Sequence, residues 1–413
     1  MEKIIVCKFG GSSTTCFEDV KRKEQIVRDN SKRKVIVVSA HGKACGLDKD
    51  TNLLIDIADK RDARGSDLII EKARKIYSNV NGNIFNEFKN QLTERIKNES
   101  LEPSAYAASI RAFGEELCTR LHAAVLGWEY VDPSELFVFE GRFDDARISP
   151  TSKNMIQQRL KGDKIFVVPG YFGYTDKRLI ATLGRGGSDL TGAYIAASLD
   201  ALVYENFTDT RGIAAASPKI VKDAKIIKEM TYEEIRGLAY SGFSVLHEEA
   251  MIPVAEKGIP IHVRSTFDYP TEGTFIARGR ELKEGETIMG VAYKPNLTAV
   301  DIDYFGLNEK IGIIEKILGQ FRERNISIEY ITTGIDDISV IFKKDQCPNR
   351  NDILFGVKSV IPEGGYVTLQ NNLGAVVVAG QGLRGNRGIA AKIQECLAES
   401  ELNLQVNSLR SWP

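Results

Sequence analysis

The chain has 413 residues, of which 43% are hydrophobic, so it can form roughly two or three domains that each bury an apolar core. Its 55 Lys and Arg residues balance 56 Asp and Glu residues, and the net charge of -1 provides no basic field to attract nucleic acid or anionic lipid. The apolar run at 4–7 is too short for a signal peptide or a membrane span, and the six scattered cysteines form no C-x-x-C pair, which predicts a cytoplasmic protein with reduced, metal-free thiols.

Strand and helix patterns alternate through the first two thirds of the chain. Short β-branched runs without polar alternation are typical of strands that are buried on both faces. They occur at 4–6, 35–38, 165–168, 201–204 and 261–263. A helix is predicted at 18–29, and 66–127 reads as consecutive helices, with Pro103 opening the one that holds Gly114 and Glu115. This alternation predicts an α/β fold, a mostly parallel open sheet between helical layers.

The pattern changes after residue 279, where a charged segment interrupts it. Beyond this point we predict a strand at 297–304, a helix at 308–324 and strands at 327–332 and 337–343. A weaker copy follows, with a strand at 375–379, a helix at 388–399 and a strand at 403–406, and at least one strand of this copy is missing. The predicted domains are therefore 1–280, 281–370 and 371–413. The last two have a ferredoxin-like pattern, which suits effector binding better than chemistry, and the second of them is truncated.

The first candidate site motif is the run of residues 8–13, KFGGSS, directly after the opening strand. Its two glycines, Gly10 and Gly11, allow backbone N–H groups to approach an anion beside Lys8. The spacing differs from a Walker A loop because the lysine precedes the glycines. Taken alone, the run also fits an ordinary structural turn.

The second motif is the glycine-rich run at 184–192, followed by a helical segment. Glycines that lead into a Ser or Asp N-cap direct free N–H groups and the positive helix end outward, which suits a phosphate. Asp189 would repel an anion there unless it orients a cation such as Lys8, and Arg185 offers a planar fork for a carboxylate. A plain capped helix is the alternative reading.

A third run, 206–212, ends the strand predicted at 201–204, at the sheet edge where ligands bind in open α/β folds. It equally fits an Asx-turn. Ser39, Thr51 and Glu115 have ordinary readings as a strand end, a helix start and a helix face. None of the four histidines lies in a nucleophile motif. Phosphoryl transfer to a carboxylate needs no base, because the acceptor is already ionised. It needs correct positioning and neutralisation of negative charge, and these motifs supply both.

Together these residues resemble the aspartate kinase family, with an amino-acid kinase fold followed by ACT regulatory units. The resemblance rests on 8–13, 37–40, 184–189, 208–209, 245–247 and 259–261, in this order. It implies that the transferred phosphoryl group is served by Lys8, Gly10, Gly11 and Asp189. It implies that aspartate is held by Ser39, Thr51, Glu115, Arg185 and Ser188, with Arg185 on the α-carboxylate and Glu115 on the α-ammonium. It assigns the nucleotide to Ser12, Gly186, Gly187, Thr208, Asp209 and Lys219.

The resemblance implies phosphorylation of the side-chain carboxylate of L-aspartate by ATP with Mg²⁺, the first step toward lysine, threonine and methionine. The metal would be held mainly by the nucleotide, and the chain would form a homodimer with lysine or threonine as effector. The chain departs from the family at Ser244, where many members have lysine, at Ala214, where tyrosine is usual, and at Lys219, where arginine follows Asp-Pro.

Two other readings remain open from the residues. A protein with the same fold could phosphorylate another acceptor, such as glutamate, acetylglutamate, carbamate or a nucleoside monophosphate. An enzyme distinguishes only weakly between substrates that differ by one methylene group. The chain could also be an amino-acid sensor with weak catalysis that binds a ligand through its C-terminal units. Comparing acceptors in one assay distinguishes the first of these readings from aspartate phosphorylation. Measuring ATP binding distinguishes the second reading from an active kinase.

Overall fold

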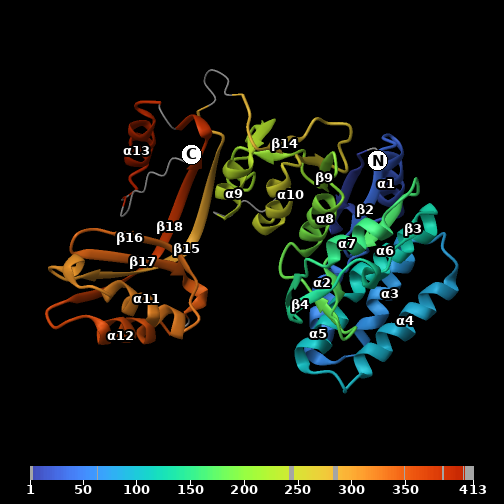
Figure 1. Cartoon of the computed structure of the whole chain (residues 1–413), viewed down its shortest axis with the longest axis horizontal. Helices are drawn as coiled ribbons and strands as arrows, with labels where there is room; N and C mark the ends of the chain where they lie inside the picture. The colour runs from blue at the N-terminus through green and yellow to red at the C-terminus, as the bar shows by residue number, and fades with distance from the viewer. Residues whose placement is uncertain are drawn as a thin grey trace. The chain divides into compact units, whose positions relative to one another are not determined.

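The computed structural model describes residues 3–62, 64–240, 246–281, 287–347, 349–383, 386–402 and 404. These residues form two compact units (Figure 1). The first contains the chain up to Ala239 and the segment that ends at Glu281, and the second contains Tyr240 and the residues that follow Glu281. Each unit has its own sheet and its own helices.

The first unit is built on an eight-stranded sheet. All neighbouring strands are parallel except the pair β13 and β14, which confirms the predicted mostly parallel sheet. In spatial order the strands are β12 (Glu229–Thr231), β14 (Thr274–Ala277), β13 (Ile261–Ser265), β9 (Val203–Thr208), β1 (Ile5–Phe9), β2 (Arg33–Val38), β6 (Phe166–Pro169) and β3 (Glu129–Tyr130). The central strands are apolar because helices cover both of their faces.

Helices cover both faces of this sheet. One layer contains α1 (Phe17–Arg28) and α6 (Phe113–Leu126), with α2 (Asp50–Lys60), α3 (Arg64–Ile76), α4 (Gly82–Lys97) and α5 (Pro103–Arg111) packed outside them. The other layer contains α7 (Ser152–Arg159), α8 (Gly187–Ser198) and α10 (Met251–Lys257), while α9 (Tyr232–Tyr240) follows the edge strand β12. Figure 1 shows α3, α4 and α5 grouped together as the predicted helical region.

Three short hairpins complete the first unit. They pair β4 (Phe139–Arg142) with β5 (Asp145–Ile148), β7 (Phe172–Tyr174) with β8 (Ile180–Thr182), and β10 (Ile213–Ala214) with β11 (Ile226–Ile227). The sequence did not predict them, since strands of two to four residues are too short to show a hydrophobic period.

One helix prediction was wrong. Pro103 does open a helix, but that helix ends at Arg111, and Glu115 lies in the next helix, α6. Ala112 at the junction keeps helical dihedrals (φ -63°, ψ -23°), so neither glycine nor proline marks the break in the sequence. As a result Glu115 lies in the first turn of α6, where backbone N–H groups have no partner within the helix.

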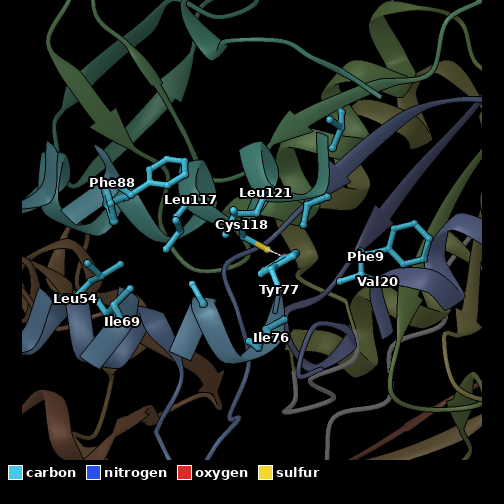
Figure 2. Packing of buried hydrophobic residues seen from close by; sticks show 14 of the residues in the cluster. Phe9, Val20, Leu54, Ile69, Ile76, Tyr77, Phe88, Leu117, Cys118 and Leu121 are labelled. Carbon is cyan, nitrogen blue, oxygen red and sulfur yellow. Dashed lines mark hydrogen bonds between the residues drawn. The ribbon is translucent and has the colours of Figure 1, made fainter. Parts of the chain in front are cut away.

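The core of the first unit lies between the sheet and the α1–α6 layer. Figure 2 shows side chains from several helices meeting there, including Phe88 of α4, Leu117 and Leu121 of α6 and Tyr77, which follows α3. Tyr77 is fully buried, and its hydroxyl lies 3.7 Å from the sulfur of Cys118. Polar groups therefore extend into an otherwise apolar core.

The second unit has a four-stranded antiparallel sheet in the order β16 (Ile328–Thr333), β17 (Asp337–Lys343), β15 (Gly290–Asp303) and β18 (Tyr366–Ala379). The helices α11 (Ile313–Glu323) and α12 (Arg350–Val360) pack together, and α12 contacts β18. This is a β-α-β-β-α-β ferredoxin-like unit, as the fold class predicted. The helix α13 (Ile389–Glu399) matches the predicted helix at 388–399.

Two details of this unit differ from the sequence prediction. The helix α12 was not predicted, and β18 is one strand of 14 residues that crosses the expected boundary between residues 370 and 371. Asn372, with a left-handed φ of 59°, and Gly374 resemble a turn in the sequence, yet β18 pairs with β15 on both sides of them. Apart from Leu404, the strand predicted at 403–406 lies outside the described residues.

Candidate functional site

The carboxyl ends of β1, β2 and β9 bring the predicted motifs to one edge of the sheet. Lys8 on β1 is in register with Val37 of β2 and Asn206 of β9. Ser39 follows β2, and Thr208 is the last residue of β9. Ligands of open α/β sheets bind at this edge, so this fold alone makes it the candidate site.

Lys8 and Asp189 are in direct contact. The Nζ atom of Lys8 lies 2.6 Å from Oδ1 of Asp189, and the two side chains are 12% and 13% exposed. Asn206 donates a hydrogen bond of 2.9 Å to the same oxygen. Asp189 lies in the first turn of α8, and these two partners hold its carboxylate toward the sheet edge. Asn206 was part of a sequence motif but was assigned no role, because its side chain gave no signal apart from its position at a strand end.

The glycine loop, residues 10–14, lies against the acceptor segment, residues 39–42. Gly10 donates its N–H to Phe207 O at 3.2 Å, and Gly42 donates to Gly11 O at 2.9 Å. A methyl group on Gly11 would lie 2.5 Å from Ala40 O, so only glycine allows the two backbones to approach this closely. Backbone contacts thereby fix the separation of the two segments.

Replacing Gly11 by alanine should lower kcat by roughly 10- to 100-fold, because the new methyl group displaces one segment of the candidate site against the other. The matched control is Gly319→Ala on α11, where the new methyl group has no neighbour within 4 Å and alanine favours the helix. Steady-state kinetics of both variants provide the measurement. Equal kcat values for Gly11→Ala and the unmodified protein would contradict the close-approach argument.

The start of α8 presents backbone N–H groups beside Lys8. Gly186 is the N-cap, with a left-handed φ of 74°, and a methyl group there would lie 2.3 Å from the Cβ atom of His247. Ser188, which is 9% exposed, packs closely against Gly170 after β6. Free N–H groups and the positive end of the helix dipole make this helix start a suitable place for a phosphate.

Glu115 is a buried carboxyl group beside the acceptor segment. Burial raises its pKa to about 8, while the N–H groups of Ala40 and of Glu115 itself act to lower it, and the negative charges of Cys118 and Asp50 raise it further. None of these causes is a neighbouring cation. A carboxyl group in this state favours ionisation as soon as an ammonium group comes into contact with it.

Tyr171 was not identified from the sequence, although it connects two parts of the site. It adopts a left-handed φ of 76°, which is costly for a tyrosine and is found mainly where the surrounding structure enforces it. Its ring packs against Gly187 at the start of α8, and its N–H donates to Thr191 Oγ1 at 3.0 Å. Burial raises its pKa, and Glu115 contributes to this shift. Backbone strain of this kind leaves no signal in a sequence.

Arg185 and Thr51 are exposed and lie apart from these contacts. Arg185 lines a cavity of about 230 Å³ together with Asp145, Arg147 and Glu249, and within the described residues it forms no ion pair. Thr51 lies at the start of α2, beside the buried Asp50. The structure thus brings Glu115 to the acceptor segment and leaves the side chain of Arg185 in solvent.

The predicted nucleotide residues lie at or near the same edge. Thr208 donates a hydrogen bond of 3.1 Å to its neighbour Asp209, while Asp209 and Lys219 are exposed. In the described part of the chain no hydrogen bond or ion pair joins Lys219 to this pair. Ala214 is buried in β10, and Ser244 lies outside the described residues.

Three general properties concern the described ranges as a whole. They contain no group of three His, Cys, Asp or Glu side chains arranged to hold a metal ion. None of their helices combines the length and the apolarity needed to cross a membrane. All six cysteines are free.

The fold and the edge site define the class of protein. Residues 3–265 match the amino acid kinase family, and the chain belongs to that family. Within it, the relatives that match nearly the whole chain are aspartokinases, and the chain is a member of this group. Aspartokinase 3 of Bacillus subtilis (strain 168) is 30% identical over 97% of this chain and 91% of the relative. The aspartokinase of Geobacillus stearothermophilus is 27% identical over 98% and 91% of the two chains.

Solved structures agree with this assignment. Aspartate kinase from Clostridium acetobutylicum has a TM-score of 0.82 and 30% identity, and the match covers 99% of this chain and 94% of that one. E. coli aspartokinase III in complex with aspartate and ADP has a TM-score of 0.79 and 23% identity, over 96% and 92% of the two chains. At 23% identity, the similarity to the E. coli structure shows a shared fold and nothing more.

Proposed function

We propose that the protein transfers the terminal phosphoryl group of ATP to the side-chain carboxylate of L-aspartate, forming 4-phospho-L-aspartate and ADP. The observation that carries the proposal is the contact between Lys8 and Asp189 at 2.6 Å, at the start of α8 and beside the glycine loop. In this arrangement Asp189 orients the ammonium group of Lys8 beside the free N–H groups of the α8 start and of the glycine loop. The sequence similarity to aspartokinases supports aspartate as the acceptor.

In the reaction, a carboxylate oxygen of aspartate forms a bond to the γ-phosphorus while the bond from that phosphorus to the bridging oxygen of ADP breaks. No proton has to move, since the nucleophile is already ionised. The barrier arises from negative charge that gathers as the carboxylate meets the phosphate. Lys8 and the N–H groups of Gly10, Gly11 and the start of α8 lower it by stabilising that charge. Asp189 keeps Lys8 directed at the phosphoryl group.

The acceptor is oriented by groups of opposite charge. Glu115 accepts the α-ammonium, which converts a buried neutral carboxyl group into one half of an ion pair. Arg185 takes the α-carboxylate through its planar fork, for which its exposed side chain has to turn inward. Ser39, Thr51 and Ser188 provide hydroxyl groups around the same ligand.

ATP lies along the sheet edge, with Ser12, Gly186 and Gly187 at its phosphates and Thr208, Asp209 and Lys219 at its nucleoside end. Mg²⁺ bound together with the nucleotide would neutralise part of the phosphate charge. The described residues include no cluster of three candidate protein ligands for a metal, and Asp189 already pairs with Lys8, so in this proposal the nucleotide would hold most of the metal's coordination sites.

The second unit serves regulation in this proposal. Its ferredoxin-like sheet has the architecture expected for binding an amino-acid effector and for pairing in a homodimer. E. coli aspartokinase III has been crystallised with lysine and aspartate, and that protein shares the fold. We therefore take lysine as the first effector to examine and threonine as the second.

Incubation with ATP, Mg²⁺, hydroxylamine and aspartate should produce aspartyl hydroxamate, because hydroxylamine traps the acyl phosphate. Glutamate, acetylglutamate and a nucleoside monophosphate serve as competing acceptors in the same assay. We expect product with aspartate alone, and release of ADP equal to the hydroxamate formed. A protein that binds ATP and yields no hydroxamate with aspartate at any concentration would contradict the proposal.

A further inference from the structure

A continuous network of buried titratable side chains lies beneath the glycine loop and the acceptor segment. Its members come from α1, α2, α3 and α6 and from the segments beside them, and each is at most 1% exposed. They are Lys23, His41, Asp50, Lys72, Tyr77, Cys118 and His122. Figure 2 shows two of these members, Tyr77 and Cys118, side by side and joined by a dashed line. The mechanism proposed above uses none of these side chains.

One arm of the network joins Tyr77 to α2 and α3. The Nε2 atom of His41 lies 3.2 Å from the Tyr77 hydroxyl, and its Nδ1 atom lies 2.5 Å from Asp50 Oδ2. Lys72 donates a hydrogen bond of 2.9 Å to the other oxygen of Asp50. The carboxylate of Asp50 is therefore held between two buried cations, since the pKa of His41 is raised to about 10 by negative partners that outweigh its burial.

The other arm joins Tyr77 to α1. His122 Nδ1 lies 3.0 Å from the Tyr77 hydroxyl, and His122 Nε2 lies 3.1 Å from Lys23 Nζ. Lys23 also donates a short hydrogen bond to Oγ1 of Thr14. Thr14 is the last residue of the glycine loop, so this arm ends on the segment that faces the phosphoryl group.

The charges and the donor capacity of the partners are consistent with one set of hydrogen-bond directions. Lys23 can only donate, so Nε2 of His122 accepts, and Nδ1 carries the proton that is donated to Cys118 O at 2.8 Å and to Tyr77. Burial and the Lys23 charge lower the pKa of His122, which agrees with a neutral ring. His41 donates from both nitrogens, so Tyr77 accepts twice and its own proton is directed at Cys118 Sγ. The Tyr77 hydroxyl thus connects both arms.

Each arm of the network contacts a segment of the candidate site. His41 belongs to the acceptor segment, where Ala40 contacts Glu115 and Gly42 contacts Gly11. Cys118 lies about one turn after Glu115 on α6. Burying this many polar groups is costly unless each is paired, and a fully paired network fixes one arrangement of the elements that carry it.

We propose that the buried network is a positioning device that sets the glycine loop and the acceptor segment at the separation required for phosphoryl transfer, with Tyr77 as its central positioning residue. This inference rests on the proposed function. Small displacements between reacting groups reduce the rate of the chemical step more than they reduce the binding of either substrate. The network therefore acts on kcat.

Replacing Tyr77 by phenylalanine removes the hydroxyl that joins the two arms and preserves the ring. We expect kcat to fall roughly 10- to 100-fold, with the KM for aspartate and for ATP changed by less than about twofold. Tyr106→Phe is the matched control, because Tyr106 is 3% exposed in the same core and, among the residues that the structure describes, its hydroxyl donates only to Ile96 O at 3.5 Å. Its kcat should match that of the unmodified protein at a temperature where all variants are folded.

Lys23→Met interrupts the other arm, and it provides a second test if Tyr77→Phe does not fold. In a double-mutant cycle the combined variant should have a kcat within about threefold of the slower single variant, since one cut already uncouples the arms. Effects that multiply, or single variants as fast as Tyr106→Phe, would overturn the inference. An unmodified protein that makes no acyl phosphate would instead reject the proposed function, so the two failures are distinguishable.

Discussion

Replacing Lys8 by alanine should lower kcat by roughly 1,000-fold or more, to the limit of detection, while the protein remains folded. Lys8 is the only side-chain cation within the described residues that forms an ion pair with Asp189, and its removal leaves the charge of the phosphoryl group unneutralised on that side. The hydroxamate assay measures the loss, and circular dichroism checks the fold. Lys8→Arg should recover little activity, because a planar guanidinium cannot replace a compact ammonium group.

The control for this substitution is Lys21→Ala on α1, where the side chain is 52% exposed and forms an ion pair with Glu24 alone among the described residues. It removes the same charge from the chain at a site away from the sheet edge, so kcat should be unchanged. ATP binding by calorimetry separates catalysis from affinity. If Lys8→Ala retained more than about a tenth of the activity, Lys8 would not stabilise the transferred phosphoryl group.

Glu115→Gln should raise the KM for aspartate by roughly 30- to 1,000-fold, since the amide cannot neutralise the α-ammonium of the substrate. In the unmodified protein the pKa of Glu115 is about 8 without substrate, so aspartate binding below pH 8 releases a proton. Its affinity should therefore increase by about tenfold for each pH unit up to pH 8 and then level off. The variant should lose this dependence.

The same substitution should stabilise the substrate-free protein at alkaline pH. A carboxyl group whose pKa is raised by folding contributes stability below its unfolded pKa, and this contribution is lost as the pH rises through about 8. The unmodified protein should thus lose up to about 5 kcal/mol of unfolding free energy between pH 4.5 and pH 8, and Glu115→Gln should not. Urea unfolding at several pH values measures the difference.

Glu116→Gln is the matched control for both effects. Glu116 is adjacent in the chain, but its carboxylate pairs with Arg95 at 2.6 Å, so its loss should leave the pH dependence of aspartate binding in place. Equal pH profiles for Glu115→Gln and the unmodified protein would show that Glu115 does not meet the ammonium group.

The strand ends that carry the motifs could be predicted because their signals are local. The β-branched runs of β1 and β2, and the glycines before α8, identify a parallel strand or a helix start wherever they occur. In contrast, α12 was missed because its apolar residues follow a helical period less clearly than those of α11, which has the same length. Ile353 and Val357 on α12 become significant only when they are buried against the sheet of the second unit.

By itself the sequence determined the class of chemistry. A lysine with glycines after the opening strand, and a second glycine-rich helix start with an aspartate, are short-range patterns whose function is limited by what backbone N–H groups and cations can bind. Only the tertiary structure decided which partners meet. The contact of Asn206 with Asp189, the raised pKa of Glu115 and the network around Tyr77 depend on burial and on side chains from distant segments. Charge and hydrogen bonding take their strength from those surroundings, which a linear pattern does not contain.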